Sequence, residues 1–323
     1  MPEGKNTMIS QPLGRRAALG MLAGTAAAGA AGAAGAGAGE AIAVPWSAGS
    51  ERPTLLAPPG AADCHHHIYD HHFPADPAAS LHPGDATVAD YRLLQRRLGT
   101  TRNVVVQPST YGTDNRCMLA ALAAFGATAR GIAVVHPDIP LAELRRMNEA
   151  GVRGIRFNLV QAGATTIEMV EPLSRRIAAF GWHVQIHMKG PQIVEAAEIF
   201  RRLPTPVVFD HLARIPEPEG VNSPAFATLR ALLDRGHVWV KLSGAYQDSR
   251  IGPPRYADIT PLARAYVKAA PERLVWGSDW PHPTEKVKPD DAVLFDLLAD
   301  WAPEAATRTQ ILVKNPEILY GFS

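Results

Sequence analysis

The sequence predicts one α/β domain with the architecture of a (β/α)8 TIM barrel. Two observations lead to this fold class: eight short apolar runs rich in β-branched residues follow residue 61, and amphipathic segments of helical length separate them. Such alternation implies parallel strands joined by helical crossovers, and eight units in roughly 260 residues match the size of this barrel. A doubly wound open sheet is the alternative. Its first strand usually leads into a Gly-rich phosphate turn, whereas this one ends in histidines.

The predicted strands are the eight apolar runs, at residues 62–68, 103–107, 131–135, 154–157, 183–187, 207–210, 238–242 and 274–276. The predicted helices between them lie at residues 115–125, 141–150, 168–180, 192–203, 225–235 and 261–270. Two further helical segments, 291–301 and 303–319, close the chain. Residues 69–90 are rich in Pro, His and Asp, which predicts a long loop over one mouth of the barrel, where substrate contacts are commonly built.

The first 43 residues are predicted to lie outside the fold. Residues 17–39 consist of Ala and Gly with four exceptions, so they offer too little side-chain volume for a core and too little apolarity for a membrane anchor. They follow Arg15-Arg16 and precede a small-x-small cleavage site at 41–43, an arrangement that resembles a twin-arginine export signal. We expect a periplasmic or exported protein, with a linker at 44–60 and the barrel at 61–323. A disordered leader on a cytoplasmic protein is the alternative.

The charge balance excludes several kinds of partner. The chain of 323 residues has 32 basic and 31 acidic residues, so it has no sequence-wide positive field for nucleic acid or an anionic membrane surface. Hydrophobic residues at 46% and charged residues at 20% are typical of a folded globular protein. Two cysteines, Cys64 and Cys117, rule out a disulfide-dense scaffold. We expect a small-molecule partner and no stable membrane association once the signal is removed.

Metal-binding side chains gather at the predicted carboxyl ends of four strands, where the chemistry of such barrels lies. His65 and His67 end the first run, and because residues two apart on a strand face the same side, both should point into the barrel mouth. His187 ends the fifth run, His211 follows the sixth and Asp279 follows the eighth.

Four imidazoles and a carboxylate form a ligand set suited to a divalent metal, with Zn as the default and Mn, Fe or Co as alternatives. A metal would polarise a carbonyl and lower the pKa of its bound water. Asp279 could take the proton from that water as general base. For single residues the alternatives are a surface histidine tract and a helix N-cap at Asp279.

These residues resemble the amidohydrolase superfamily, with its His-x-His on the first strand, histidines after strands 5 and 6, and aspartate after strand 8. The resemblance narrows to the branch of 2-pyrone-4,6-dicarboxylate lactonase, which also holds sugar-acid lactonases and lactonases for sulfonated muconolactones. It covers about residues 61–321. The segments that carry it are residues 104–107, 151–158, 181–184, 210–211 and 276–283.

The resemblance implies roles for individual residues of the site. It places His65, His67 and His211 around a lactone carbonyl and makes Asp279 the residue that activates water. Arg156 matches a family arginine that grips a substrate carboxylate. The other substrate-binding candidates are Ser109 and Tyr111 after strand 2, Arg214 after His211, and Lys241 on strand 7.

Three departures from the branch bear on the substrate, and a fourth bears on the metal. An arginine of the pyrone lactonase pattern is missing from residues 160–163, a second is missing from residues 244–248, and a loop tyrosine is missing near Leu81. Since arginine grips carboxylates bidentately, we expect a mono- or differently anionic lactone, such as a sulfonated one, rather than the pyrone dicarboxylate. The pyrone lactonase works without a metal and lacks the histidine that stands here at His187, so we expect a bound divalent metal, with Zn favoured.

The expected reaction is hydrolytic opening of an anionic lactone by water that Asp279 deprotonates. The metal, or the cluster of His65, His67, His187 and His211 without one, would stabilise the oxyanion. Two other functions stay open. A metal-dependent decarboxylase would use the same site, and an exported binding protein would leave Asp279 without a role. Homo-oligomerisation is compatible with either enzyme.

Overall fold

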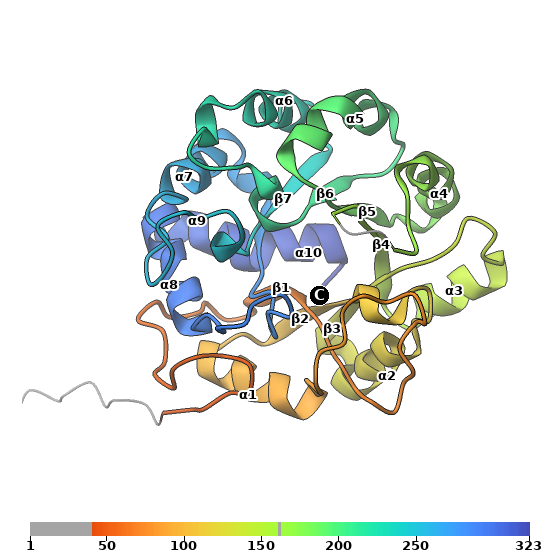
Figure 1. The fold of residues 1–323 in the computed structure, drawn as a ribbon, viewed down its shortest axis with the longest axis horizontal. Coiled ribbons are helices and arrows are strands. Elements are labelled where there is room, and N and C mark those ends of the chain that lie inside the picture. Colours follow the sequence, from red (N-terminus) through yellow and green to blue (C-terminus); the bar gives the residue numbers. More distant parts are fainter. Residues whose placement is uncertain (1–40, 161–162) are drawn as a thin grey trace, which may run out of the picture. The chain divides into compact units, whose positions relative to one another are not determined.

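The computed structural model describes residues 41–160 and 163–323, which form a single (β/α)8 barrel (Figure 1). The described strands lie in one parallel sheet in the order β1 to β8, with the helices around it. The fold class predicted from the alternating runs is therefore confirmed. The strands are β1 (Ala62–His66), β2 (Arg102–Val106), β3 (Ala129–Ala133), β4 (Val152–Asn158), β5 (His183–His187), β6 (Val207–Phe209), β7 (Val238–Leu242) and β8 (Leu274–Trp276).

Most helices lie around the outside of the barrel, whereas the last one, α10, lies across its centre in the view of Figure 1. They are α1 (Val88–Leu98), α2 (Arg116–Phe125), α3 (Leu141–Glu149), α4 (Val170–Ile177), α5 (Gly190–Arg202), α6 (Pro224–Leu233), α7 (Thr260–Ala269), α8 (Asp291–Trp301), α9 (Ala305–Thr309) and α10 (Asn315–Tyr320). Between α9 and α10 the chain runs through a π-helical turn, Gln310–Lys314, so the last predicted helix is three short pieces. The predicted helix at 168–180 is likewise α4 with a 3₁₀ turn at each end.

Helix α1 occupies a region where the sequence predicts a loop as far as residue 90. Its first turn is stabilised by a reciprocal capping box, in which Thr87 accepts from the Asp90 backbone and Asp90 accepts from that of Thr87. This Thr-x-x-Asp spacing was the available signal for the helix. The preceding Pro- and His-rich stretch obscured it.

Two hydrophobic cores meet at the strands. The larger one lies between strands and helices, as alternate residues such as Val105, Val184 and Val240 show. The smaller one fills the barrel interior and includes Val104, Val208 and the C-terminal residues Leu319, Tyr320 and Phe322. The C-terminal segment of the chain therefore contributes to the interior core.

The barrel closes where β1 approaches the segment after β8. His66 forms a parallel bridge with Trp280, and backbone bonds join His67 N to Trp280 O and Asp279 N to His65 O, both at 2.8 Å. A Cβ on Gly277 would lie 2.6 Å from the Cβ of His65, so the approach requires glycine. The register of β1 against β2 also shifts between Asp63 and His66, an irregularity of the kind that re-aims side chains near active sites.

Residues 41–60 have no helix or strand and pack against the barrel near α1 and α8. The buried Arg97 of α1 donates to the Ala48 and Glu51 carbonyls, and Trp280 donates to the Pro45 carbonyl. The predicted export signal lies outside the described residues except for its last three positions. Within the described part of the chain, no helix has both the length and the apolarity to cross a membrane.

Candidate active site

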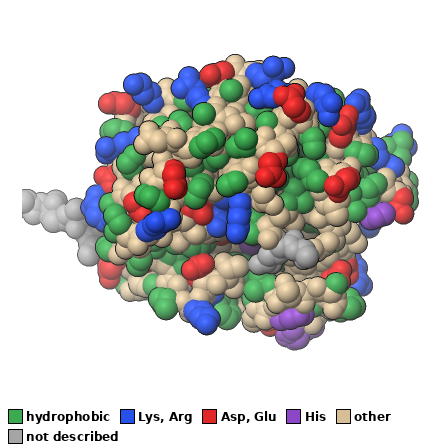
Figure 2. All heavy atoms as spheres, turned by 45° about the horizontal axis from the view of Figure 1, so that its top comes forward, with side chains coloured by type: hydrophobic (Ala, Val, Ile, Leu, Met, Phe, Trp, Pro, Cys, Tyr) green, Lys and Arg blue, Asp and Glu red, His purple; other side chains and the backbone are tan. Residues whose placement is uncertain are grey.

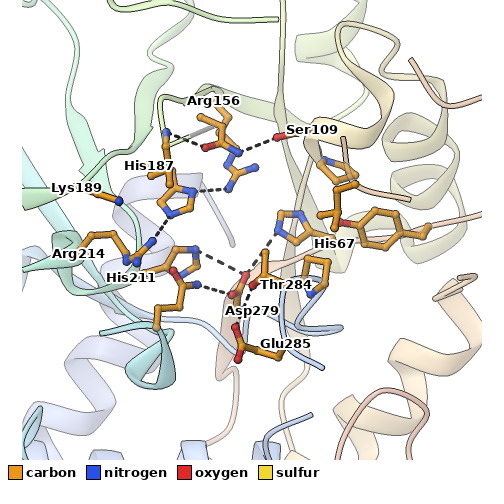
Figure 3. Close-up of a pocket in the computed structure, with 17 residues that line it drawn as sticks. His67, Ser109, Arg156, His187, Lys189, His211, Arg214, Asp279, Thr284 and Glu285 are labelled. Carbon is orange, nitrogen blue, oxygen red and sulfur yellow. Dashed lines mark hydrogen bonds and ion pairs between the residues drawn. The ribbon is translucent and has the colours of Figure 1, made fainter. Parts of the chain in front are cut away.

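A pocket of about 340 Å³ opens at the carboxyl ends of the strands (Figure 3). This volume lies within the range of small-molecule sites. Its lining combines side chains from β4, the end of β5, and the segments that follow β1, β2, β6, β7 and β8. Among the residues that line it are His67, Tyr69, Leu81, Ser109, Arg156, Asn158, His187, Lys189, His211, Arg214, Gln247, Asp279 and Glu285.

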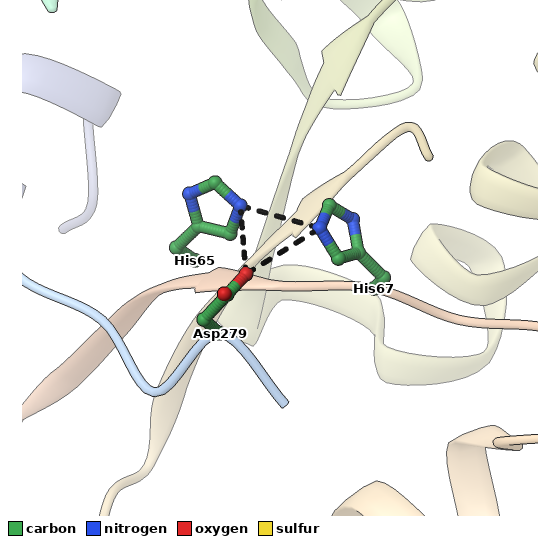
Figure 4. Close-up of side chains that lie close together, drawn as sticks. All are labelled: His65, His67 and Asp279. Carbon is green, nitrogen blue, oxygen red and sulfur yellow. Dashed lines mark hydrogen bonds and ion pairs between the residues drawn. The ribbon is translucent and has the colours of Figure 1, made fainter. Parts of the chain in front are cut away.

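A cluster of three imidazoles surrounds one oxygen of Asp279. Oδ1 of this residue lies 3.5 Å from Nε2 of His65, 3.6 Å from Nε2 of His67 and 3.7 Å from Nε2 of His211. The Nε2 atoms of His65 and His67 are 3.3 Å apart (Figure 4). We call these four residues the imidazole–carboxylate cluster.

The other ring nitrogen of each imidazole, Nδ1, also has a partner, and the three partners differ in chemistry. Nδ1 of His67 lies 2.8 Å from the Val106 carbonyl, which can only accept, so this nitrogen donates. Nδ1 of His65 lies 3.2 Å from the buried carboxylate of Asp210, and Nδ1 of His211 lies 2.9 Å from Oγ of Ser243. Nζ of Lys241 also lies 3.3 Å from Nδ1 of His65, and Oγ of Ser243 can donate or accept, so only the proton on Nδ1 of His67 is fixed by its partner.

This arrangement fits a divalent metal. Bonds of 2.0–2.1 Å to a tetrahedral ion place neighbouring ligand atoms about 3.4 Å apart, close to the 3.3, 3.5 and 3.6 Å that separate the facing atoms of His65, His67 and Asp279. Partners on Nδ1 that fix the tautomer are typical of metal-binding histidines. His65, His67 and Asp279 also satisfy the spacing of a three-residue metal site. The structure therefore contains a His/Asp site that can hold a divalent ion.

The electrostatics keep Asp279 ionised. Burial alone would raise the pKa of Asp279, but His211, His67 and His65 around it hold that pKa well below its usual range. Burial lowers the pKa of His65 well below the ordinary value and also lowers the pKa of His211. An ionised carboxylate is suited to accept a proton.

Left-handed backbone aims two residues of the cluster. His211 has φ 51° and Asp279 has φ 66°, a region that non-glycine residues rarely occupy and that concentrates at functional sites. The turn at Gly244 packs closely against His211 in space, since an added Cβ on Gly244 would lie 2.9 Å from Nδ1 of His211. Local backbone strain and close packing therefore hold this part of the site in place.

A cationic side of the pocket lies next to the cluster. His187 stands between two guanidinium groups, with Nδ1 3.5 Å from Arg156 and Nε2 3.2 Å from Arg214 (Figure 3). Arg214 is held by Asp248 through contacts of 2.6 and 3.2 Å, and Lys189 lines the same side. Both ring nitrogens of His187 thus face arginines, which differs from its expected place among the metal ligands.

The remaining predicted substrate residues divide into two groups. Ser109 lines the pocket and accepts a hydrogen bond from Asn158 at 2.8 Å. Tyr111 is buried away from the pocket lining, because its hydroxyl bonds to both the backbone N and O of Asp70. Lys241 does not contact the pocket either, contrary to its expected role.

Lys241 instead belongs to a buried polar layer inside the barrel, beneath His65. Its Nζ donates to the Cys64 carbonyl at 2.9 Å and to Oε1 of Gln185 at 2.7 Å, and it lies 3.5 Å from Asp210. Gln185 in turn donates to Asp210 at 3.1 Å. Lys241 is an inward-facing strand residue too far down the barrel for substrate, and it supports the carboxylate that orients His65.

Sequence reasoning missed several residues of the site. Asp210 ends the β6 run, and its position beside His211 was the available signal. Asn158 is the last residue of β4 and Lys189 lies two residues after β5, so the rule that identified His187 at a strand end also applies to them. Tyr246 and Gln247, which donate to Asp279, come from the turn after β7 and carried no comparable signal.

This chain belongs to the amidohydrolase family, whose model matches residues 62–322, as the sequence resemblance indicated. It is 39% identical to a 2-pyrone-4,6-dicarboxylate hydrolase of Comamonas testosteroni over 85% of this chain and 94% of that protein. It is 36% identical to a 4-sulfomuconolactone hydrolase of Rhizobium radiobacter over 83% of this chain and 92% of that protein. A solved Pseudomonas putida structure, described as a 2-pyrone-4,6-dicarboxylic acid hydrolase, matches with a TM-score of 0.73 and 31% sequence identity. The match covers 83% of this chain and 99% of that one.

Proposed function

We propose that this protein hydrolyses the ring of an anionic lactone. The observation that carries the proposal is an ionised carboxylate, Asp279, set among imidazoles and facing the same pocket as Arg156 and Arg214. A base next to anion-binding groups suits attack of water on an acyl carbon whose substituents carry negative charge. The lactone hydrolases among the relatives support the same reaction.

In the proposed mechanism, Asp279 removes a proton from water, and the resulting hydroxide attacks the lactone carbonyl. The bond between the carbonyl carbon and the ring oxygen breaks, and the proton on Asp279 passes to that oxygen. The product is the open hydroxy acid or its keto tautomer. Arg156 and Arg214 hold the anionic substituents so that the carbonyl lies over the cluster.

The proposed cofactor is a divalent metal, with zinc favoured, held by His65, His67, His211 and Asp279. Bound there, it would polarise the lactone carbonyl and lower the pKa of water. Metal analysis of protein purified without chelator tests this assignment, and we expect about one ion per chain. Metal far below one per chain together with full activity would contradict it.

The substrate is proposed to be a lactone other than the pyrone dicarboxylate. Leu81 and Gln247 line the pocket in segments where the pyrone lactonase pattern has a tyrosine and an arginine. The cationic residues that line the pocket are Arg156, Lys189 and Arg214. They can bind an anionic group of the substrate, which favours one carboxylate or sulfonate on this side of the pocket.

A hydrolysis screen tests the reaction and the substrate together. The panel holds a pyrone dicarboxylate, muconolactones with and without sulfonate, and sugar-acid lactones, each with and without added Zn²⁺. We expect a product heavier than its substrate by one water. Release of CO2 would instead establish decarboxylation, and tight binding without turnover would establish a binding protein.

We also propose export to the periplasm through the twin-arginine-like leader of residues 1–43. Fractionation of cells that produce the full chain tests this, with an Arg15→Lys, Arg16→Lys variant as the control. Equal retention of both forms in the cytoplasm would contradict it.

A further inference from the structure

The two oxygens of Asp279 have different surroundings. Oδ1 faces the imidazole–carboxylate cluster, as described above. Oδ2 accepts one hydrogen bond from the Tyr246 hydroxyl at 2.6 Å and one from Nε2 of Gln247 at 3.0 Å. These two donors stabilise the carboxylate orientation in which Oδ2 faces them and Oδ1 faces the cluster.

Tyr246 is itself held by a buried pair behind it. Its hydroxyl lies 2.9 Å from Nδ1 of His282, and Nε2 of that ring lies 3.1 and 3.2 Å from the two oxygens of Asp291. His282 and Asp291 are fully buried. Since a carboxylate only accepts, Nε2 of His282 donates to it, which fixes the ring and the point at which Nδ1 meets Tyr246.

The order of contacts is therefore Asp291, His282, Tyr246 and Asp279. Asp291 is the first residue of α8, while Tyr246 belongs to a 3₁₀ turn after β7, Ala245–Gln247. The contacts therefore join the turn after β7 to the segment between β8 and α8, next to Asp279. The Tyr246 hydroxyl has one proton, which it donates to Oδ2 of Asp279, so its oxygen meets Nδ1 of His282 as an acceptor, and that contact holds the oxygen beside Oδ2.

We propose that Tyr246, held by His282 and Asp291, is a positioning residue that keeps Oδ1 of Asp279 turned toward the imidazole cluster. Its kinetic consequence rests on the proposed lactone hydrolysis. Tyr246 is not among the residues that line the catalytic pocket, so its loss should act on the chemical step rather than on substrate binding.

The central test is Tyr246→Phe, which removes the hydroxyl and keeps the ring. Because the lost bond is to a charged acceptor, kcat should fall about 10- to 100-fold, with KM changed less than about threefold. Tyr320→Phe is the matched control. This tyrosine is buried, but its hydroxyl has no hydrogen-bond partner in the part of the chain that the structure describes, so its loss should leave kcat near wild type.

A double variant separates positioning from a general loss of packing. If His282 acts only through Tyr246, then His282→Asn combined with Tyr246→Phe should be about as slow as the slower single variant. Multiplication of the two single effects would overturn the proposal, as would wild-type kcat in Tyr246→Phe.

A crystal structure of Tyr246→Phe provides a readout that needs no activity. We expect the Asp279 carboxylate to rotate away from the wild-type orientation, and an unchanged carboxylate would overturn the proposal. If the wild-type protein hydrolyses none of the lactones, the proposed function fails, and this structural comparison alone decides the positioning role.

Discussion

Replacing Asp279 with Asn tests the general base, because it removes the charge and the basicity while keeping the shape. In the variant the amide oxygen can take the place of Oδ2 and accept from Tyr246 and Gln247. The amide NH2 then faces the Nε2 lone pairs of the cluster and can donate to them. The hydrogen bonds around the residue survive, so the fold should survive as well.

The loss of activity should be large by comparison. A positioned general base contributes about 10²–10⁴ in rate, and the variant also loses one of the four donor atoms for a metal. We expect kcat to fall at least about 100-fold, with a thermal midpoint within about 4 °C of wild type. Turnover of the best lactone from the screen, together with a thermal melt followed by circular dichroism, measures both quantities.

A matched control comes from the other carboxylate that lines the pocket. Glu285 lies on the same side of the pocket as Asp279 in Figure 3 but has no imidazole cluster around it. Glu285→Gln removes the same charge from the pocket and should keep turnover close to wild type. Near wild-type turnover in Asp279→Asn, or an equal loss in both variants, would refute the assignment of Asp279 as base.

Three further predictions concern binding, pH and stability. Arg156→Met should raise KM for anionic lactones about 10- to 100-fold through loss of a charge-assisted bond, and an unchanged KM would remove Arg156 from the substrate site. The depressed pKa of Asp279 and the lowered pKa values of His65 and His211 mean that the active forms persist as pH falls, so kcat/KM should stay flat from pH 8 to about pH 5.5; an acidic limb near pH 6.5 would argue against this. Gly277→Ala should lower the free energy of unfolding by about 1–3 kcal/mol in a denaturant titration, because its Cβ would collide with His65, and an unchanged midpoint would contradict the tight closure.

The barrel could be predicted because its strands are short apolar runs between turns. Strands β5, β7 and β8 have the predicted bounds. Where the bounds shift, as at β3 and β4, the cause is that strand pairing extends into residues such as Arg130 and Arg153, which are polar and half-buried. Propensity alone does not locate these ends, since pairing with a neighbour decides them.

The site could be predicted only as far as strand ends define it. His65, His67, His211 and Asp279 meet because parallel strands end at the same rim. The depth of a side chain within the barrel was not predictable from the sequence. Lys241 was therefore predicted to line the pocket, whereas it lies in the polar layer beneath it.

The atoms that suit a divalent metal are not those of His187. His187 was the residue that set this chain apart from a metal-free relative, yet its two nitrogens face Arg156 and Arg214. The stronger argument lies at His67, where the Val106 carbonyl forces the proton onto Nδ1 and leaves Nε2 as a lone pair directed at His65 and Asp279. Lone pairs and a carboxylate oxygen that converge at 3.3–3.6 Å repel one another unless a ring proton or a metal cation lies between them. His187 is better explained as a neutral ring that lies between the two arginines and accepts a hydrogen bond from one of them.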